Sequence, residues 1–343
     1  MTEQFTIPVG YKFSCIGLNT NLHRDITAEL QSLDLGGGLW AVFELPFKID
    51  DIWKKWLGSI QSDRFAENNV FLLTIAPSDA PGILDSENQW LSSCVQKYYY
   101  SILLHGVAYS QQAPLLSGAN TDTPDVRQVG SLNTSYRPGY VKHQSINVDT
   151  LVSAAQVYAG IQAVFRQDNK YMRIRRGLHA WRRAVEESDA HYRLHQFVRA
   201  IEAVIKPGRR VNKLTEQFVH RTQFFTGHSP SAAEIVSAFY ELRSAAEHMY
   251  DLEPVLSTKL QSLCSKFPAY SPAKIITMLS YQAEVLVRFI YTSILKDANL
   301  QNTFIDDDSI TQFWDQTDDI IKNTLGNPID LEAAVKNNFI DYI

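Results

Sequence analysis

Residues 194–205, LHQFVRAIEAVI, decide the fold of the second half of the chain. Apolar residues recur there at intervals of three and four, which is the repeat of one face of an α-helix. The positions that form this stripe are Leu194, Phe197, Val198, Ile201, Val204 and Ile205. A half-buried strand would instead alternate with a period of two. The stretch therefore predicts an amphipathic helix with one buried face and with Glu202 at the edge of that face.

The sequence on both sides continues this helical pattern, from about residue 150 to residue 297. Ser229 and Pro230 form a helix start signal before AAEIVSAFYEL, because serine caps the first amide groups and proline suits the first helical position. Ser271 and Pro272 repeat the signal before AKIITMLSYQAEVLVRFIYTSIL. No strand pattern interrupts this region, so we expect an all-helical bundle of four to six helices.

The first 108 residues mix the two patterns. YKFSCIGL, LWAVFELPF and NVFLLTIA are short runs rich in β-branched and aromatic residues, which favour strands. DDIWKKWLGSI and ENQWLSSCVQKYYYSILLHGVAY have helical character. We expect a mixed α/β or α+β domain. The glycines at 36–38 precede a strand and lack a following Gly-Lys-Ser/Thr, so they do not form a phosphate loop.

Between residues 109 and 149 the periodicity disappears. Pro, Gly, Ser, Asn and Thr dominate SQQAPLLSGANTDTPDVRQVGSLNTSYRPG, which predicts a linker or a long loop. The chain is therefore expected to be α+β overall. The predicted parts are a mixed N-terminal domain at 1–108, a linker at 109–149, a helical bundle at 150–300 and an acidic C-terminal tail at 301–343.

The composition favours a cytoplasmic protein with a real apolar core. Apolar residues make up 45% of the 343 residues. The three cysteines, Cys15, Cys94 and Cys264, are odd in number and far apart, which argues against a disulfide framework and a zinc site. The N-terminus lacks the pattern of a signal peptide, and no run of 18 apolar residues predicts a membrane helix.

Charge is distributed unevenly along the chain. Residues 1–150 carry a net −5, residues 151–300 a net +7 and residues 301–343 a net −7. The basic middle suggests an anionic partner such as RNA, and the alternative is an ordinary solvated surface. The candidate RNA-binding residues are Arg173, Arg175, Arg176, Arg182, Arg183, Lys206, Arg209 and Arg210, with Lys213 beside them.

The acidic tail has two interpretations. It either folds over the basic middle and competes with RNA, or it packs elsewhere for apolar reasons. The residues that favour packing are Phe313, Trp314, Ile320, Ile321 and Leu325, which recur at near-helical spacing.

The segment 240–250, YELRSAAEHMY, carries the strongest candidate for chemistry. At 100° per residue, Arg243 and Tyr250 lie on the edge of the predicted buried face, and His248 projects about 140° away from Arg243. The predicted buried face consists of Ile235, Phe239, Leu242, Ala246 and Met249. A joint role therefore requires that the helix bends or ends near His248, or that a second helix supplies a partner group. In the structural alternative, Arg243 pairs with Glu247 and His248 is solvated.

The pattern R-x4-H-x-Y on a late helix of an all-α bundle resembles the HEPN superfamily, many of whose members are metal-independent RNases. Arg243, His248 and Tyr250 carry the match, and the order of the helices looks most like the Apea-type subgroup. Glu202, on the helix of 194–205, fits the early helix of that fold. The resemblance covers about 150–300. Ser244 departs from the pattern, since many active members carry Asn, Asp or His there, and this leaves catalytic competence open.

The resemblance implies an RNase of the toxin or antiviral-defence kind, with an N-terminal domain that senses a trigger. Arg243 and His248 would be catalytic, and Glu202, Ser244 and Tyr250 would support them. Family members commonly pair around a two-fold axis, so a homodimer through the helical domain is implied. The alternative is a non-catalytic HEPN module that binds RNA, a nucleotide or a regulatory protein partner.

No metal or cofactor is expected. His191 and His195 have the i, i+4 spacing of a metal-binding pair, but no HExxH glutamate lies between them.

Overall fold

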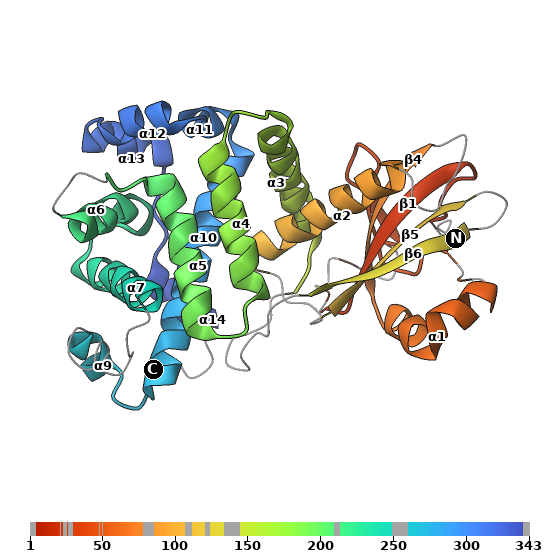
Figure 1. Cartoon of the computed structure of the whole chain (residues 1–343), viewed down its shortest axis with the longest axis horizontal. Coiled ribbons are helices and arrows are strands. Elements are labelled where there is room, and N and C mark those ends of the chain that lie inside the picture. Colours follow the sequence, from red (N-terminus) through yellow and green to blue (C-terminus); the bar gives the residue numbers. More distant parts are fainter. Residues whose placement is uncertain are drawn as a thin grey trace. The chain divides into compact units, whose positions relative to one another are not determined.

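The computed structural model describes residues 5–20, 22, 26, 30–47, 49, 51–77, 86–106, 112–120, 124–133, 145–208, 213–248 and 260–338. The chain divides into a sheet unit, residues 1–134 and 143–158, and a helical unit, residues 135–142 and 159–343. Figure 1 shows strands in the first and only helices among the described residues of the second. The predicted α+β fold class is confirmed.

The sheet unit is built on six antiparallel strands in the order β2-β3-β4-β1-β5-β6. The strands are β1 (Tyr11–Leu18), β2 (Ser32–Asp34), β3 (Leu39–Val42), β4 (Val70–Pro77), β5 (Gln112–Asn120) and β6 (Pro124–Asn133). β1 pairs with β4 on one side and β5 on the other, and Cys15 lies opposite both Leu73 and Leu116. The three strands predicted in residues 1–108 correspond to β1, β3 and β4, and β3 ends earlier than predicted.

The two faces of the sheet are covered by different helices. These are α1 (Asp51–Ala66), which contains a kink at Gly58, and α2 (Ser86–Leu104). Phe13 on β1 belongs to an apolar core that includes Phe65 of α1. The next residue, Ser14, points to the opposite face, where its Oγ lies 3.1 Å from the Ser92 Oγ of α2. This alternation is the period of two expected of a strand.

The prediction of a linker or long loop at 109–149 is wrong where β5 and β6 form. β5 lies inside the sheet, and its Ala113, Leu115 and Leu116 are buried. Pro114 is tolerated because pairing with β1 reaches only as far as Leu115, so its missing amide hydrogen removes no bond to that strand. The composition signalled turns, but pairing with strands distant in sequence overrides that local signal.

The helical unit is organised around α5. Its helices are the second part of α3 (Val148–Arg166), α4 (Met172–Glu186), α5 (Ala190–Ile205), α6 (Leu214–Thr226), α7 (Pro230–Glu247), α9 (Gln261–Lys266), α10 (Pro272–Lys296), α11 (Ala298–Thr303), α12 (Asp307–Trp314), α13 (Asp318–Leu325) and α14 (Leu331–Asn338). α5 packs against α4, α7 and α10 (Figure 1). All six residues of its predicted stripe are 0% exposed, so the stripe is the buried face.

The predicted helix starts are also found. The Ser229 Oγ accepts a hydrogen bond from the Ala232 amide at the start of α7, and the Ser271 Oγ accepts one from the Lys274 amide at the start of α10. The number of helices exceeds the predicted four to six, since the described residues from 148 to 296 hold seven, including the short α9. None of the helices in the described part of the chain is long and apolar enough to span a membrane.

The C-terminal residues are not a detached acidic tail in the part that is described. α12 and α13 pack near α5 and α6, and α14 packs against α10. Phe313, Trp314 and Ile321 are buried, whereas Ile320 is 49% exposed. Apolar packing therefore holds this segment to the helical unit, as one of the two interpretations predicts. Its acidic side chains in the described part are exposed, and Asp307 among them also pairs with Arg173 and Lys206 of the basic middle.

Candidate functional site

Arg243 of α7 is held between two carboxylates. Its Nη2 lies 3.2 Å from the Oε2 of Glu202 on α5, and its Nη1 pairs with the carboxylate of Glu247, one turn further along α7. The side chain of Arg243 is only 18% exposed, and its Cζ lies 5.8 Å from the centre of the Tyr240 ring. A guanidinium in this position is fixed in orientation before any ligand arrives.

The sequence places Arg243 on the edge of the buried face of α7, and the structure agrees. Leu242 beside it is completely buried, as are most predicted residues of that face. Ala246 is only half-buried, and Ala245 is buried in its place. Met249 lies outside the described residues. The buried face therefore includes Ala245 rather than Ala246 in the last turn of α7.

Arg243 extends along α5. His191 donates from Nε2 to the carbonyl oxygen of Leu242, at 3.0 Å, so the backbone of α7 beside Arg243 lies near residue 191. Residue 202 is eleven positions further along α5, about 16 Å at the rise of an α-helix. These contacts between α5 and α7 therefore extend from His191 to Glu202, and His195 lies one turn after His191 on the same face of α5.

Burial shifts the protonation equilibria of this seam. Burial raises the pKa of Glu202, and Arg243 opposes the rise by favouring the carboxylate. Burial lowers the pKa of His195 from its usual value, and the positive charges of Arg199 and Arg243 lower it further. Burial and the Glu202 carboxylate raise the pKa of Tyr240. His195 is therefore held in its neutral form near pH 7.

Two polar atoms of the seam lack hydrogen-bond partners among the described residues. They are the Nε2 of His195 and the Nε of Arg243, and both are fully buried. Buried polar atoms in native proteins are nearly always hydrogen-bonded to protein or water, since an unpaired one costs about 1–3 kcal/mol. The seam thus keeps hydrogen-bonding capacity that its own side chains do not use.

His248 occupies the end of α7. Its amide donates to the carbonyl oxygens of Ser244 and Ala246, and its side chain is exposed. The helix therefore ends at His248, which is one of the routes by which Arg243 and His248 can share a site. The Arg243–Glu247 pair of the structural alternative is present as well. Ser244 is half-buried, and Tyr250 lies outside the described residues.

Several of the candidate RNA-binding residues already have partners. The Nε of Arg173 lies 2.6 Å from one Asp307 carboxylate oxygen, and the Nζ of Lys206 lies 3.6 Å from the other. Arg175 donates to the Val164 carbonyl oxygen and so caps the end of α3. These three cations stabilise the fold, which reduces the positive charge that α4 and the end of α5 offer to a nucleic acid.

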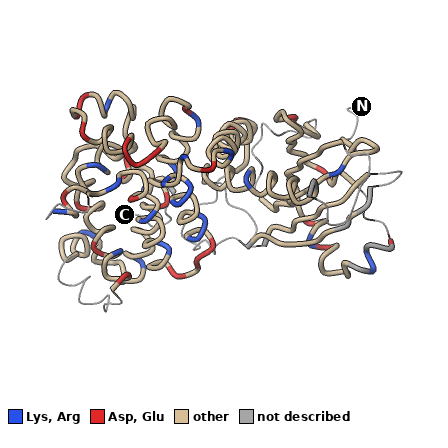
Figure 2. Tube along the Cα trace, turned by 45° about the horizontal axis from the view of Figure 1, so that its top comes forward, with Lys and Arg blue, Asp and Glu red and all other residues tan. Residues whose placement is uncertain are grey.

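The remaining basic candidates are less engaged. Arg182 pairs with Glu186 at 3.0 Å on an exposed face, and Lys213 pairs with Glu216 at 2.9 Å. The exposed residues of the predicted set in the described chain also include Arg176 and Arg183, and the two that lie outside the described residues are Arg209 and Arg210. Figure 2 shows Lys and Arg of the helical unit interspersed with Asp and Glu.

Sequence reasoning considered His191 and His195 only as a possible metal pair. Their spacing to Glu202, eleven and seven residues, places all three on one face of α5, and this signal could have joined them to Arg243. No group of three or more His, Cys, Asp or Glu side chains suited to a metal ion occurs in the described part of the chain.

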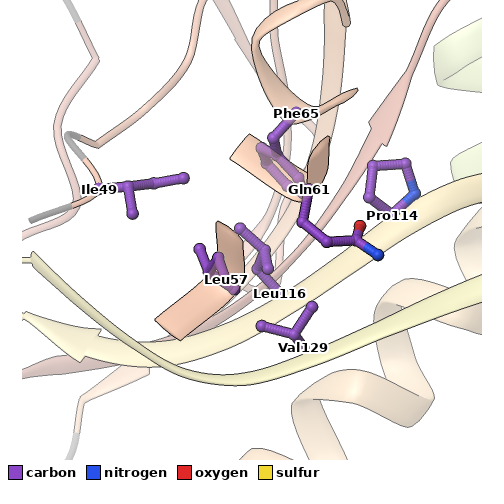
Figure 3. A pocket seen from close by; sticks show the side chains of 7 residues that line it. All are labelled: Ile49, Leu57, Gln61, Phe65, Pro114, Leu116 and Val129. Carbon is purple, nitrogen blue, oxygen red and sulfur yellow. The ribbon is translucent and has the colours of Figure 1, made fainter. Parts of the chain in front are cut away.

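A small apolar hollow in the sheet unit has fewer polar side chains than the α5–α7 seam. It lies between α1 and the β5–β6 strands, and Gln61 is the one polar side chain among its seven lining residues (Figure 3). Phe65 and Leu116 link it to the core of the sheet unit. Binding sites usually combine an apolar wall with several convergent polar groups, so the α5–α7 seam is the stronger candidate.

Comparisons of the chain with models of protein families, with curated proteins and with solved structures found no match.

Proposed function

We propose that the helical unit is a metal-independent endoribonuclease in which Arg243 and His248 act on one phosphodiester. The observation that carries the proposal is the arrangement of α7. Arg243 is fixed in the seam with α5, and α7 ends five residues later at an exposed histidine. The rise over five residues is about 7.5 Å and the two side chains project about 140° apart, so a shared site uses the end of α7 or the second protomer of a two-fold dimer.

The chemistry of RNA cleavage without a metal matches these groups. The reaction needs a base for the 2′-hydroxyl, an acid for the leaving 5′-oxygen and positive charge at the phosphorane. Histidine exchanges protons in the required pH range, and a guanidinium donates two parallel hydrogen bonds to phosphate oxygens. The expected products are a 2′,3′-cyclic phosphate and a 5′-hydroxyl.

The phosphate must replace one carboxylate at Arg243. The side chain of Glu247 is 46% exposed, whereas that of Glu202 is 19% exposed. The Glu247 carboxylate is already partly solvated. Separating it from Arg243 therefore costs less free energy than separating the more buried Glu202 carboxylate. Glu202 then stays in place and keeps the guanidinium aligned. Under this proposal Glu202 positions Arg243 and Glu247 acts as an exchangeable stand-in for the phosphate.

The sheet unit would sense a trigger or restrain the RNase, in a toxin or antiviral-defence system, and the helical unit would form a homodimer. Both statements rest on the HEPN resemblance and on the division of the chain into two units.

A second candidate function is a HEPN module that binds RNA, a nucleotide or a protein without cutting RNA. The two carboxylates on Arg243 favour it, because together they neutralise the guanidinium that catalysis would use. Ser244 also favours the non-catalytic module, because many active HEPN members carry Asn, Asp or His at this position.

The decisive experiment incubates the purified protein with total RNA, with and without EDTA. We expect cleavage in both conditions, and we expect Arg243→Ala and His248→Ala each to lower the rate by about 100-fold or more. Arg166→Ala and His179→Ala are matched controls, since both residues are exposed on helices outside the seam. A wild-type protein that binds RNA but does not cut it would favour the second candidate. Normal cleavage by both variants would refute the assignment.

A further inference from the structure

We infer that Tyr192 and Arg199, on the outer face of α5, form a nucleotide-binding subsite beside Arg243. The tyrosine ring stacks on an unpaired base, and the guanidinium of Arg199 binds a neighbouring phosphate of the same strand. This subsite rests on the proposed function, because it requires RNA at Arg243, and it deepens that function by naming the groups that position the strand.

Both residues lie within the stretch of α5 that meets α7. Leu242 and Arg243, which are consecutive on α7, contact α5 at His191 and at Glu202 respectively. The interval between these two contacts contains both members of the subsite. A strand that extends from Arg243 across α5 therefore passes over them.

The two side chains face solvent, on the side of α5 opposite its buried stripe. Arg199 follows Tyr192 by seven positions, so the two lie within about 20° of each other around the helix and about 10.5 Å apart along it. Tyr192 is 57% exposed, and Arg199 is exposed as well. α4 and α7 flank α5, and α10 packs behind it (Figure 1). A ligand can therefore reach both groups without any movement of the fold.

Arg199 is available to bind a phosphate. Its guanidinium pairs with no carboxylate in the described part of the chain, although Glu202 lies about one turn further along α5. The Glu202 carboxylate pairs with Arg243 instead. Burial raises the pKa of Glu202, and the charges of Arg243 and Arg199 both lower it. Positive charge from the two arginines therefore acts on the same part of α5.

The two ends of the subsite differ in charge. Asp189, the N-cap of α5, accepts hydrogen bonds from the amides of His191 and Tyr192, so a carboxylate lies beside the tyrosine. A phosphate is repelled at that end, whereas stacking of a base on an aromatic ring needs no positive charge. The charges therefore favour a base at Tyr192 and a phosphate at Arg199. Because duplex bases are already stacked on one another, this arrangement selects an unpaired nucleotide.

The stacking role is tested by fluorescence anisotropy with a labelled 2′-O-methyl RNA strand of about 12 nucleotides, whose blocked 2′-hydroxyls prevent cleavage. Tyr192→Ala should weaken binding about 5-fold or more through the loss of one stacked base, and Tyr192→Phe should stay within about 2-fold of the wild type. The control is Trp90→Ala, since Trp90 is an aromatic residue of α2 that is 55% exposed, and it should bind like the wild type. Pairing the strand with its complement should abolish the effect of Tyr192→Ala.

The phosphate role is tested by the salt dependence of the same binding. Each phosphate contact to a single strand contributes about 0.7 to the slope of log K against log salt concentration. Arg199→Gln should reduce the slope by about that amount, and Arg166→Gln, which removes an exposed charge from α3, should leave it unchanged. In cleavage assays Tyr192→Ala and Arg199→Gln should raise KM and leave kcat within about 2-fold, because they remove binding shared by the ground and transition states.

The outcomes separate the subsite from the RNase function. Equal affinity of the wild type and Tyr192→Ala, or equal losses on the single strand and the duplex, would overturn the stacking role. An unchanged salt slope in Arg199→Gln would overturn the phosphate role. Both results leave the RNase function standing if the wild type cuts RNA. A wild-type protein that binds the strand through these residues and cuts no RNA would refute the RNase function alone, and one that binds no RNA would refute both.

Discussion

Replacing Trp314 tests whether the acidic C-terminal segment is an integral part of the fold that carries the site. Trp314 of α12 is 6% exposed and donates from Nε1 to the Val204 carbonyl oxygen at 3.0 Å. That carbonyl lies in the last turn of α5, where main-chain oxygens have no partner within the helix. Arg221 of α6 donates to the next carbonyl, that of Ile205. Two side chains from other helices therefore cap the end of α5, the helix that carries Glu202.

The magnitude follows from these contacts. The Trp314 ring packs against Phe313, with centroids 4.9 Å apart, and against Phe224 and Phe225, at 6.0 and 6.3 Å. Truncating a buried tryptophan to alanine costs about 3–5 kcal/mol, and the unpaired Val204 carbonyl places the loss in the upper half of that range. Trp314→Phe keeps most of the ring contacts and loses the hydrogen bond, so it should cost about 1–2 kcal/mol.

Guanidinium unfolding followed by circular dichroism measures these losses as shifts of the midpoint. The matched control is Ile320→Ala, because Ile320 is apolar, lies in the neighbouring α13 and is 49% exposed. It should change the free energy of unfolding by at most about 0.5 kcal/mol. We expect Trp314→Ala to lower the thermal midpoint by about 8–20 °C. Equal midpoints for Trp314→Ala and Ile320→Ala would refute the integral role. In that case a truncation after Leu300 becomes the proper test of an acidic tail that competes with RNA.

Two further predictions concern charge and assembly. Asp307→Asn should lower the free energy of unfolding at pH 7 by less than about 1 kcal/mol, and the thermal midpoint slightly, because the Asp307 side chain is 62% exposed. The hydrogen bond from Arg173 lowers the pKa of Asp307, so its stabilisation is present above the unfolded value near 3.8 and disappears as the pH falls through the lower folded value. Scanning thermal midpoints from pH 7 to pH 2 should therefore show the wild type and the variant converging at the acid end, and a constant gap would contradict this. Sedimentation at roughly tens of micromolar, where weak dimers still form, should show a dimer through the helical unit. A monomer would argue against a shared two-fold cleft.

The sequence by itself determined the parts of the fold whose signals are local. The stripe of α5 was predicted residue by residue, because a helix repeats its buried face every three to four positions. The serine caps of α7 and α10 follow from side-chain chemistry within three residues. β1 was predicted because its apolar run is continuous over a strand's length. The placement of Arg243 at the edge of the α7 core also follows from periodicity alone.

Only the tertiary structure decided what lies beside each of these elements. β5 and β6 carry turn-like residues; β5 is a strand because it pairs with β1, about a hundred residues earlier in the chain, and β6 is a strand because it pairs with β5. The Arg243 side chain meets Glu202, 41 residues away, and the Trp314 indole meets a carbonyl 110 residues away. Helical phase tells which way a residue faces along its own axis, but it contains no information on which other helix faces it. The seam that joins Glu202 to Arg243 exists because burying the apolar stripes of α5 and α7 brings their polar edges together.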